Sequence, residues 1–391
     1  MASLVAVPNQ ARLRIALVAT WYPSPGREGL GVFVREHARA LAAVADVVVI
    51  YPDLGEQAKS RAWTIQDAIE DGVRTIRLHV RRPEVRGART VLLAIAVRNA
   101  LRRLASEGWR PDVIHAHVFF AGLLALPARP RHTPLVITEH YSGLALGTVR
   151  GVDLWLARLA YARADLVCPV SENLALHLRH LGVRTPIRVV PNAIDTERFR
   201  PAEAPRDGGP IRALLVAGLT EVKQVHTLLE ALALTRKRAR APDVVLDVAG
   251  DGPLLDQLRA RADALGLDSV VRWLGRRRTE EVAELMRRSD VAVLSSRWEN
   301  LPVVLLEAMA SGLPVIAPAV GGVPEIVDAD AGVLVQSGDV AALADALTAV
   351  AGRLDAYDAA ALHARAALRY GFAAVTDRWL AIYDELLAAR A

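Results

Sequence analysis

Short apolar runs alternate with segments of helical spacing along almost the whole chain, and this alternation limits the possible folds more than any other feature. The run RIALVAT, which begins at Arg14, leads through a turn-rich loop into a helical segment near residues 32–44 and then into a second apolar run, DVVVIYP. Continuous apolar runs of this length are typical of strands buried on both faces of a parallel sheet. The sequence therefore predicts α/β units whose helices cover both faces of a sheet.

The alternation stops once and then restarts. Residues 196–210, TERFRPAEAPRDGGP, are rich in proline, glycine and charge, which is typical of a linker. We therefore expect two doubly wound domains, residues 1–195 and 211–371, followed by a C-terminal helix, residues 372–391, that packs back toward the first domain. Ligands of such sheets lie beyond the carboxyl ends of the strands, and a cleft between two domains suits a ligand with two ends.

Composition excludes several classes of protein. The chain has 391 residues, of which 52% are hydrophobic and 23% charged, so two well-packed domains are expected rather than disorder. Its one cysteine, Cys168, offers neither a disulfide framework nor a thiolate metal site, which favours a reducing cytoplasm. No signal-peptide pattern is evident in the first residues, and no apolar run is long enough to span a membrane.

Charge is distributed unevenly between the two halves. Residues 1–200 hold 27 Lys+Arg against 17 Asp+Glu, and residues 201–391 hold 21 against 26, so the halves carry +10 and −5. A basic half can face nucleotide phosphates, nucleic acid or anionic lipid headgroups. We expect no nucleic acid partner, because the arginines lack interleaved aromatic residues and are typical of a solvated face. Peripheral contact of the first half with the inner face of a membrane stays open. The arginines in question are Arg74, Arg77, Arg81, Arg82, Arg86, Arg89, Arg98, Arg102 and Arg103.

Residues 298–325, WENLPVVLLEAMASGLPVIAPAVGGVPE, place an acidic side chain in an apolar helix. The helix is expected to begin with Asn300 as its N-cap and Pro302 in its first turn, and to end at Gly312. Every neighbour of Glu307 in it is apolar, and an ionised carboxylate in such surroundings requires hydrogen-bond donors. The donors are either an amide or arginine in a structural pair, or a ligand rich in hydroxyl groups.

The first half offers weaker signals of a site. Gly29 and Gly31 precede the first helix, where free amides and the helix dipole favour an anion, but Val34 occupies the place of the third glycine of a dinucleotide motif.

Four further polar residues follow predicted strands. Glu139 and His140 are equally compatible with lining a site and with a structural role, and His115 and His117 are more typical of structural histidines. A zinc site is less well supported, because neither a cysteine pair nor a helical His-x-x-x-His motif accompanies these residues.

The second half resembles the retaining glycosyltransferases of family 4. The motifs that carry the resemblance are AGLTEVK, VAGDGPL, VRWLG, SDVAVLSSRWENLPVVLLEAMASGLPVIAPAVGGVPEIV and AGVLVQSGD. The first half is similar more loosely, in TWYPSPGREGLGVFVREHARAL, PDVIHAH, VITEHYS, ADLVCPVS and VVPNAID. The resemblance implies the GT-B fold, in which two Rossmann-like domains face each other across a cleft. It also implies that the second domain binds a nucleoside-diphosphate sugar and the first binds the acceptor.

The resemblance implies roles for matching positions. Glu307 would accept hydrogen bonds from the ribose, Glu299 would hold the transferred sugar or stabilise its positive charge, and Lys223 would bind the phosphates. His140 would lie near the sugar and the acceptor, and Gly31 would bring its loop against the diphosphate. The start of the second-domain helix would hold the diphosphate through the backbone of Asn300, Leu301, Pro302 and Val303.

The chain departs from the family at Gly218, where an arginine is often found. One of two phosphate cations is therefore missing from its usual place, and Arg27 or an arginine among residues 276–278, Arg276 in particular, is a candidate replacement. Asp328 and Asp330 have the spacing of a metal motif, but they lie in a turn where solvated acids are common.

Retention also shapes the expected chemistry, because the departing phosphate can itself take the proton of the acceptor. We expect no dedicated base, no metal and no cofactor beyond the nucleotide sugar, with UDP favoured over GDP. The acceptor is a glycan, a lipid-linked molecule or a small molecule. The alternatives are an epimerase or phosphorylase of the same fold, a non-catalytic nucleotide-binding module and, least favoured because its glycine motif is absent, a nicotinamide dehydrogenase.

Overall fold

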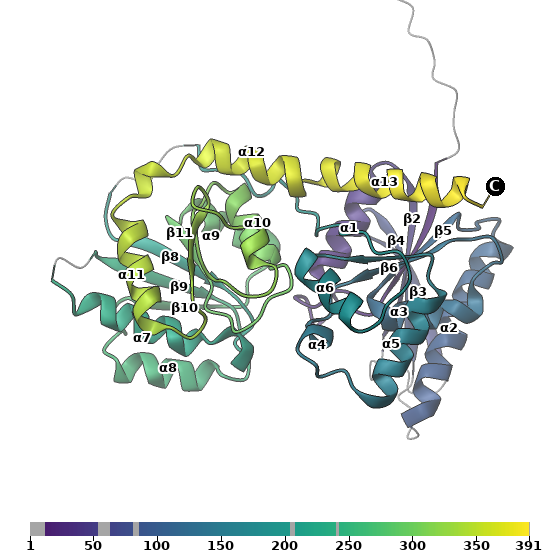
Figure 1. Ribbon diagram of the computed structural model, residues 1–391, viewed down its shortest axis with the longest axis horizontal. Coiled ribbons are helices and arrows are strands. Elements are labelled where there is room, and N and C mark those ends of the chain that lie inside the picture. The colour runs from purple at the N-terminus through teal and green to yellow at the C-terminus, as the bar shows by residue number, and fades with distance from the viewer. Residues whose placement is uncertain (1–11, 54–62, 81–85, 204–207, 240–241, 391) are drawn as a thin grey trace, which may run out of the picture.

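The protein folds into two α/β domains that lie side by side (Figure 1). This computed structural model describes residues 12–53, 63–80, 86–203, 208–239 and 242–390. The first domain contains a seven-stranded sheet with the order β3-β4-β2-β1-β5-β6-β7, and the second contains a six-stranded sheet with the order β10-β9-β8-β11-β12-β13. The predicted α/β architecture with two sheets is therefore confirmed. Residues 1–11 and part of the predicted linker, residues 204–207, lie outside the described residues.

The elements of the first domain follow the predicted alternation. They are β1 (Arg14–Ala19), α1 (Val32–Ala42), β2 (Asp46–Asp53), β3 (Trp63–Glu70), β4 (Val73–Val80), α2 (Arg86–Ser106), β5 (Val113–His117), α3 (Val118–Ala125), η1 (Leu126–Ala128), β6 (Leu135–Glu139), α4 (Ser142–Ala145), α5 (Gly151–Arg163), β7 (Leu166–Pro169) and α6 (Glu172–His180).

The second domain repeats the pattern and ends in helices. Its elements are β8 (Ile211–Val216), η2 (Glu221–Lys223), α7 (Val225–Arg236), β9 (Val244–Ala249), α8 (Leu255–Ala264), β10 (Val271–Gly275), α9 (Thr279–Arg287), β11 (Val291–Val293), α10 (Val303–Ala310), β12 (Val315–Pro318), η3 (Val323–Glu325), β13 (Gly332–Val335), α11 (Val340–Ala351), η4 (Leu354–Ala356), α12 (Ala359–Tyr370) and α13 (Phe372–Ala388).

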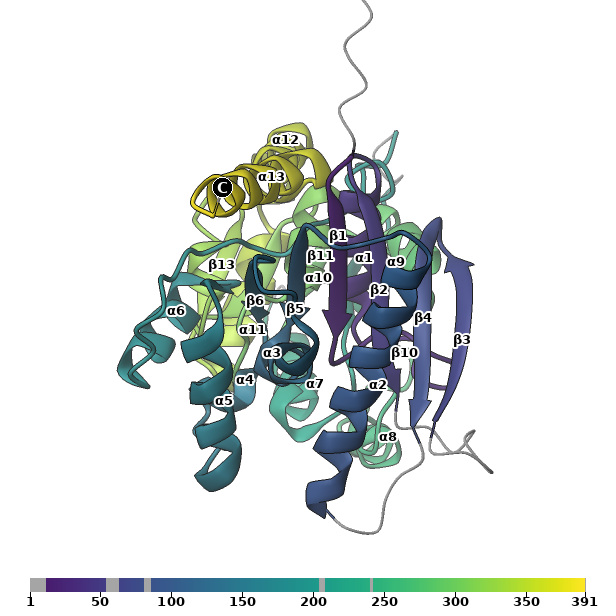
Figure 2. The same ribbon diagram turned by 90° about the vertical axis from the view of Figure 1, so that its right-hand side faces the viewer.

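Strand β3 differs from the prediction. It pairs antiparallel with β4 at the edge of the first sheet (Figure 2), whereas the other strand pairs of the two sheets are parallel. Its sequence, WTIQDAIE, has no apolar run longer than two residues, and Ile65 and Ile69 are 38% and 69% exposed. None of residues 64–70 is buried, so this edge strand lacks the continuous apolar run that is typical of a strand buried on both faces.

The C-terminal helix α13 leaves the second domain and packs on the first (Figure 1). It contacts α1, and its residues Val375, Trp379, Ile382 and Tyr383 belong to the same buried cluster as residues of β1, β2 and α1. The chain therefore crosses between the domains twice, once before β8 and once between α12 and α13.

Many arginines of the basic first half form ion pairs. Arg74 and Arg103 both contact Asp67 and Glu107, while Arg77 contacts Glu70, which is 7 positions away on β3. Arg81 and Arg82 lie outside the described residues. Within the described part of the chain, no helix combines the length and the apolar character that crossing a membrane requires.

Candidate active site between the domains

Residues 298–325 form part of the second domain's side of the contact between the two domains. The Asn300 side-chain Nδ2 donates a hydrogen bond of 2.6 Å to the backbone oxygen of His140 in the first domain. The Glu325 carboxylate accepts 2.8 Å hydrogen bonds from the backbone N–H groups of Glu172 and Asn173, at the start of α6. This acidic side chain lies where the dipole of α6 favours negative charge. The stretch therefore holds the two domains together as well as carrying candidate site residues.

The predicted start of this helix was wrong. Helix α10 begins at Val303 and Pro302 is its N-cap, so Asn300 lies two residues before the cap. The side chain of Asn300 is used instead across the interface, and it also accepts a 3.2 Å hydrogen bond from Nε1 of Trp298. Because proline has no backbone N–H, Pro302 cannot donate to a phosphate, and the amides of Asn300, Leu301 and Val303 remain among the residues proposed near the cap.

Lys223 and Glu299 are brought into direct contact. The Lys223 Nζ donates to Glu299 Oε1 at 2.5 Å, and the Ser296 hydroxyl donates to the same oxygen at 2.6 Å. Lys223 follows β8 and Glu299 follows β11, and these two strands are neighbours in the sheet. The carboxyl ends of adjacent parallel strands thus place a cation and a well-oriented acid at one point, as ligand sites in such sheets require.

Glu307 lies on α10 with a partly buried side chain. No side chain or backbone amide among the described residues donates a hydrogen bond to it, so the structural pair that the sequence allowed is not found there. Burial raises the pKa of Glu307 to about 8, and the nearby charge of Glu36 acts in the same direction, opposed by Arg198. An acceptor group without a donor is therefore present at the place where the resemblance implies a ribose.

The raised pKa of Glu307 predicts how stability depends on pH. Between the ordinary carboxyl value of 4.5 and about 8, the folded protein binds this proton more tightly than the unfolded chain does. The free energy of unfolding therefore falls as pH rises through this window, because the unfolded chain releases the proton that the folded protein retains. Glu307→Gln removes that effect, so we expect its Tm to exceed the wild-type Tm more at pH 8 than at pH 5. Glu203→Gln, at an exposed position, is the control, and a difference in Tm that does not grow with pH would contradict the assignment.

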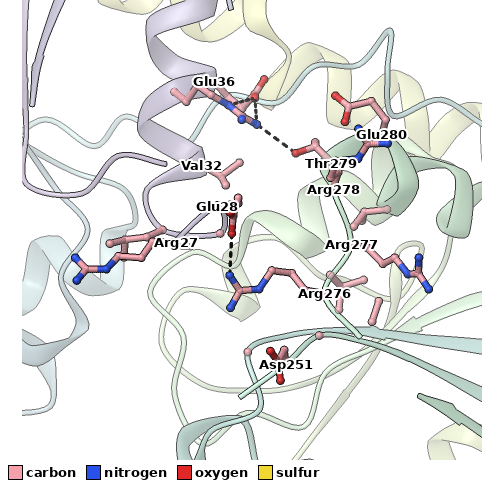
Figure 3. A pocket seen from close by; sticks show the side chains of 18 of the residues that line it. Arg27, Glu28, Val32, Glu36, Asp251, Arg276, Arg277, Arg278, Thr279 and Glu280 are labelled. Atoms are coloured by element: carbon pink, nitrogen blue, oxygen red, sulfur yellow. Dashed lines mark hydrogen bonds and ion pairs between the residues drawn. The ribbon is translucent and has the colours of Figure 1, made fainter. Parts of the chain in front are cut away.

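A cleft of about 1320 Å³ lies between the domains (Figure 3). The first domain lines it with residues 26–30 and with α1, and the second lines it with the ends of β8 and β9 and with residues 276–280. Gly218 and Arg276 face it, as do Glu36 and Arg198, the charges that act on Glu307. Lys223, Glu299, Glu307 and His140 are not among its lining residues.

Arg276 spans the cleft from the second domain. Its Nη1 lies 3.0 Å from Glu28 Oε2 in the glycine-containing loop of the first domain (Figure 3). Both side chains are more than half exposed, so this ion pair contributes little to stability. An anion that enters the cleft can therefore bind Arg276 in place of Glu28 with little loss of free energy.

The two glycines of the predicted site have opposite surroundings. Gly31 is the N-cap of α1 with φ of 72°, and a Cβ there would lie 2.4 Å from the backbone carbonyl of Trp21. Only glycine fits this position without strain. A Cβ at Gly218 would meet nothing within 4 Å, so the missing arginine is not excluded by lack of space.

Glu139 does not line the site, but it holds a neighbouring loop in place through hydrogen bonds. Its carboxylate is fully buried and accepts hydrogen bonds from the backbone amides of Phe119, His140 and Tyr141, at 2.8 to 3.0 Å, and from the Tyr161 hydroxyl at 2.6 Å. Burial raises the pKa of this carboxyl, although all four donors oppose the shift. The acid therefore fixes the loop that carries His140.

His140 lies above a group of buried histidines that includes His37, which the sequence reasoning missed. Helical spacing on α1 could have shown that His37 faces inward. Nitrogens of His37, His115 and His117 lie within 4.8 Å of one another, but both nitrogens of His115 bond hydroxyls at 2.6 Å. Only two Nε2 atoms, of His37 and His117, are buried without a partner in the described part of the chain. Two free nitrogens do not make the four-ligand set of a structural zinc.

Comparison with known proteins identifies the family of the chain. The family described as Glycosyl transferases group 1 matches residues 196–352, and Glycosyltransferase Family 4 matches residues 27–198. The chain is 31% identical over 376 residues to glycogen synthase of Mycobacterium tuberculosis, which covers 91% of this chain and 89% of that protein. It is 33% identical to the D-inositol 3-phosphate glycosyltransferase of Saccharomonospora viridis over 71% of each chain.

Solved structures share the fold. Sucrose-phosphate synthase of Thermosynechococcus elongatus superimposes with a TM-score of 0.77 at 22% identity, covering 97% of this chain and all of that one. Anabaena HepE in complex with UDP and glucose gives a TM-score of 0.75 at 20% identity, over 95% of this chain and all of that one. The chain therefore belongs to the glycosyltransferases of family 4, and its two Rossmann-like domains form the GT-B fold.

Proposed function

We propose that this glycosyltransferase transfers a sugar with retention from a nucleoside-diphosphate sugar, with UDP favoured, to a hydroxyl of a glycan, lipid-linked or small-molecule acceptor. The observation that carries the proposal is Glu307, a partly buried acid with no hydrogen-bond donor among the described residues, next to charges that line the cleft. The two hydroxyls of a ribose supply the donors that such an acid requires.

The contact between Lys223 and Glu299 supports a role in the chemical step. A departing diphosphate gains negative charge, so a fixed cation stabilises the transition state more than the ground state. Glu299, held by Lys223 and Ser296, is placed to bind sugar hydroxyls or to stabilise positive charge at the anomeric carbon. The C–O bond to the phosphate breaks as the acceptor oxygen bonds the anomeric carbon on the same face, and the phosphate oxygen takes the acceptor proton.

Arg276 is the best-placed substitute for the arginine that is absent at Gly218. It lines the same cleft, while its partner Glu28 holds it only through an exposed ion pair. In our proposal the donor diphosphate draws Arg276 away from Glu28. Arg27 also lines the cleft and is the second candidate.

We further propose that the reaction requires no divalent metal. Asp328, half of the possible metal motif, accepts hydrogen bonds from Arg365 at 2.7 and 2.8 Å and from the backbone amides of Asp330 and Ala331. The same contacts lower its pKa, with Arg365 the largest cause. These contacts support a structural role for the turn. Activity that disappears in EDTA and returns with a divalent ion would overturn this part of the proposal.

The donor and acceptor are open within this class. One relative is a glycogen synthase and another acts on D-inositol 3-phosphate by name, while related folds have been solved with UDP and, in starch synthase IV, with ADP and acarbose. UDP-, GDP- and ADP-sugars should therefore be tested together for thermal stabilisation. A donor at 1,000 times its Kd should stabilise by about 4 kcal/mol. Failure of every sugar nucleotide would overturn the proposed function.

The alternatives differ in what Glu299→Ala would do. A non-catalytic nucleotide-binding module would keep its function in this variant, whereas a transferase would lose turnover while still binding the nucleotide. An epimerase or phosphorylase would form no glycoside from a sugar nucleotide and an acceptor. Product analysis with the wild-type protein separates these last two from the proposed reaction.

Peripheral contact with an anionic membrane, at the cytoplasmic face, is a further part of the proposal. On α5, Val152 and Trp155 are 72% and 61% exposed, and Arg150 and Arg158 flank them, with Asp153 as the opposing charge. Exposed apolar groups beside arginines suit the interface of an anionic bilayer. Cosedimentation with anionic vesicles should weaken in Trp155→Ser, and equal binding by the two proteins would refute this contact.

A further inference from the structure

A stack of buried imidazoles lies directly beneath His140. The ring centroids are 4.8 Å apart between His115 and His117 and 5.2 Å apart between His117 and His140, with planes inclined by only 19° and 13°. Burial is the largest cause that lowers the pKa of all three rings, to about 3 for His140. The rings are therefore neutral near pH 7, and each has one N–H donor and one acceptor nitrogen.

The hydrogen bond between His117 and His140 determines where their protons lie. Nδ1 of His117 and Nε2 of His140 are 2.9 Å apart, so one of these two nitrogens carries a hydrogen. The other nitrogen of His117, Nε2, is buried and has no partner among the described residues. A buried N–H without an acceptor is rarer than a buried acceptor without a donor. The proton of His117 therefore belongs on Nδ1, from which it is donated to His140.

This assignment leaves His140 with its own proton on Nδ1. The residue is partly exposed, and Nδ1 is neither bonded to a described residue nor among the buried unpartnered atoms. It is the nitrogen that remains available to a ligand in the interface.

The backbone of His140 is held by other groups. Asn300 donates to its carbonyl at 2.6 Å, Glu139 accepts from its amide at 2.9 Å, and the ring of Phe33 packs 4.3 Å from its ring. Loss of His117 would therefore leave the main chain in place and remove the only hydrogen bond that the His140 imidazole makes with a described residue.

We propose that His117 is a positioning residue that fixes the ring orientation and the Nδ1–H form of His140. His140 then presents an N–H donor, and not an acceptor, to an oxygen of the bound sugar. The identity of that ligand rests on the proposed function, but the proton positions are a property of the free protein and can be tested without any substrate.

Two substitutions separate positioning from packing. His117→Asn places its side-chain NH₂ where Nδ1 stands and retains the donor to His140, whereas His117→Leu fills the space without a donor. His115→Leu is the control, because His115 is equally buried in the same stack but bonds Tyr383 and Thr138 and not His140. Imidazole ¹H–¹⁵N correlation spectra of the full-length proteins report which nitrogen of His140 is protonated, and steady-state rates follow with the donor that the panel identifies.

We expect His140 to be protonated on Nδ1 in the wild type, in His117→Asn and in His115→Leu, and to lose this single form in His117→Leu. The kcat of His117→Leu should fall by about tenfold or more with a smaller change in donor KM, and His117→Asn should recover most of it. Protonation of His140 on Nε2 in the wild type, or equal losses in the Asn and Leu variants, would overturn the proposal. If the wild type transfers no sugar at all, the proposed function fails while the spectra still decide the positioning.

Discussion

Lys223→Ala is expected to lower kcat by about two to three orders of magnitude while the donor KM changes much less. The loss is of the size found when one preorganised charge-stabilising group is removed from an active site. Because Gly218 stands where the family often has an arginine, our proposal gives Lys223 a larger share in stabilising the charge that develops on the departing diphosphate. We expect kcat to fall more than KM rises, because the interaction of Lys223 with the phosphate strengthens only in the transition state.

The control for this variant is Lys237→Ala, an exposed lysine at the C-cap of α7. It removes the same charge from the same domain and should leave kcat and KM unchanged. Removal of Lys223 also leaves Glu299 Oε1 with Ser296 as its remaining hydrogen-bond partner among the described residues, so folding should be checked by thermal melting. An unchanged kcat in a folded Lys223→Ala protein would contradict the role assigned to this cation.

Trp379→Ala is expected to lower the free energy of unfolding by about 3–5 kcal/mol, the usual cost of truncating a large buried aromatic residue. The side chain is 1% exposed and is the largest fully buried one in the described chain. It packs against His37 and His115 with ring centroids 5.2 and 4.5 Å away. Its Nε1 has no hydrogen-bond partner among the described residues, so the predicted loss comes from packing.

Leu368→Ala provides the comparison on the neighbouring helix α12. Leu368 is 75% exposed, and its truncation should change stability by no more than about 0.5 kcal/mol. Urea unfolding of both variants measures the difference. If Trp379→Ala unfolds at the wild-type urea concentration, helix α13 is not part of the first domain's core in solution.

Local patterns were sufficient to predict two largely parallel sheets and an acid that needs hydrogen-bond donors, whereas Lys223 was predicted only from the resemblance to the family. Continuous apolar runs indicate strands that are buried on both faces, and an acid among apolar neighbours indicates that a hydrogen-bond donor must contact it. The apolar pattern does not predict strand β3, because it lies at the edge of the sheet and none of residues 64–70 is buried. Nothing in residues near Asn300 shows that its amide reaches His140, since that contact depends on the docking of the two domains.

The contacts of the buried histidines also could not be predicted from local sequence patterns. Their alternation on β5 predicts that His115 and His117 share one face, but not that His37 and helix α13 meet them there. Contacts between elements distant in sequence decide which nitrogen is bonded, and these contacts arise only in the folded chain. The hydroxyl partners of His115 are 23 and 268 positions away from it.

The two chain segments that connect the domains are joined to each other by backbone hydrogen bonds. Ile194 donates its backbone N–H to Tyr370 at 2.9 Å and accepts from the N–H of Phe372 at 3.1 Å. A single covalent connection lets a domain swivel freely, whereas two connections joined side by side resist twisting and leave rotation about one axis as the soft motion. Rotation about that axis would have to break the hydrogen bonds of Asn300 and Glu325 to the first domain, so these contacts oppose the separation of the two domains.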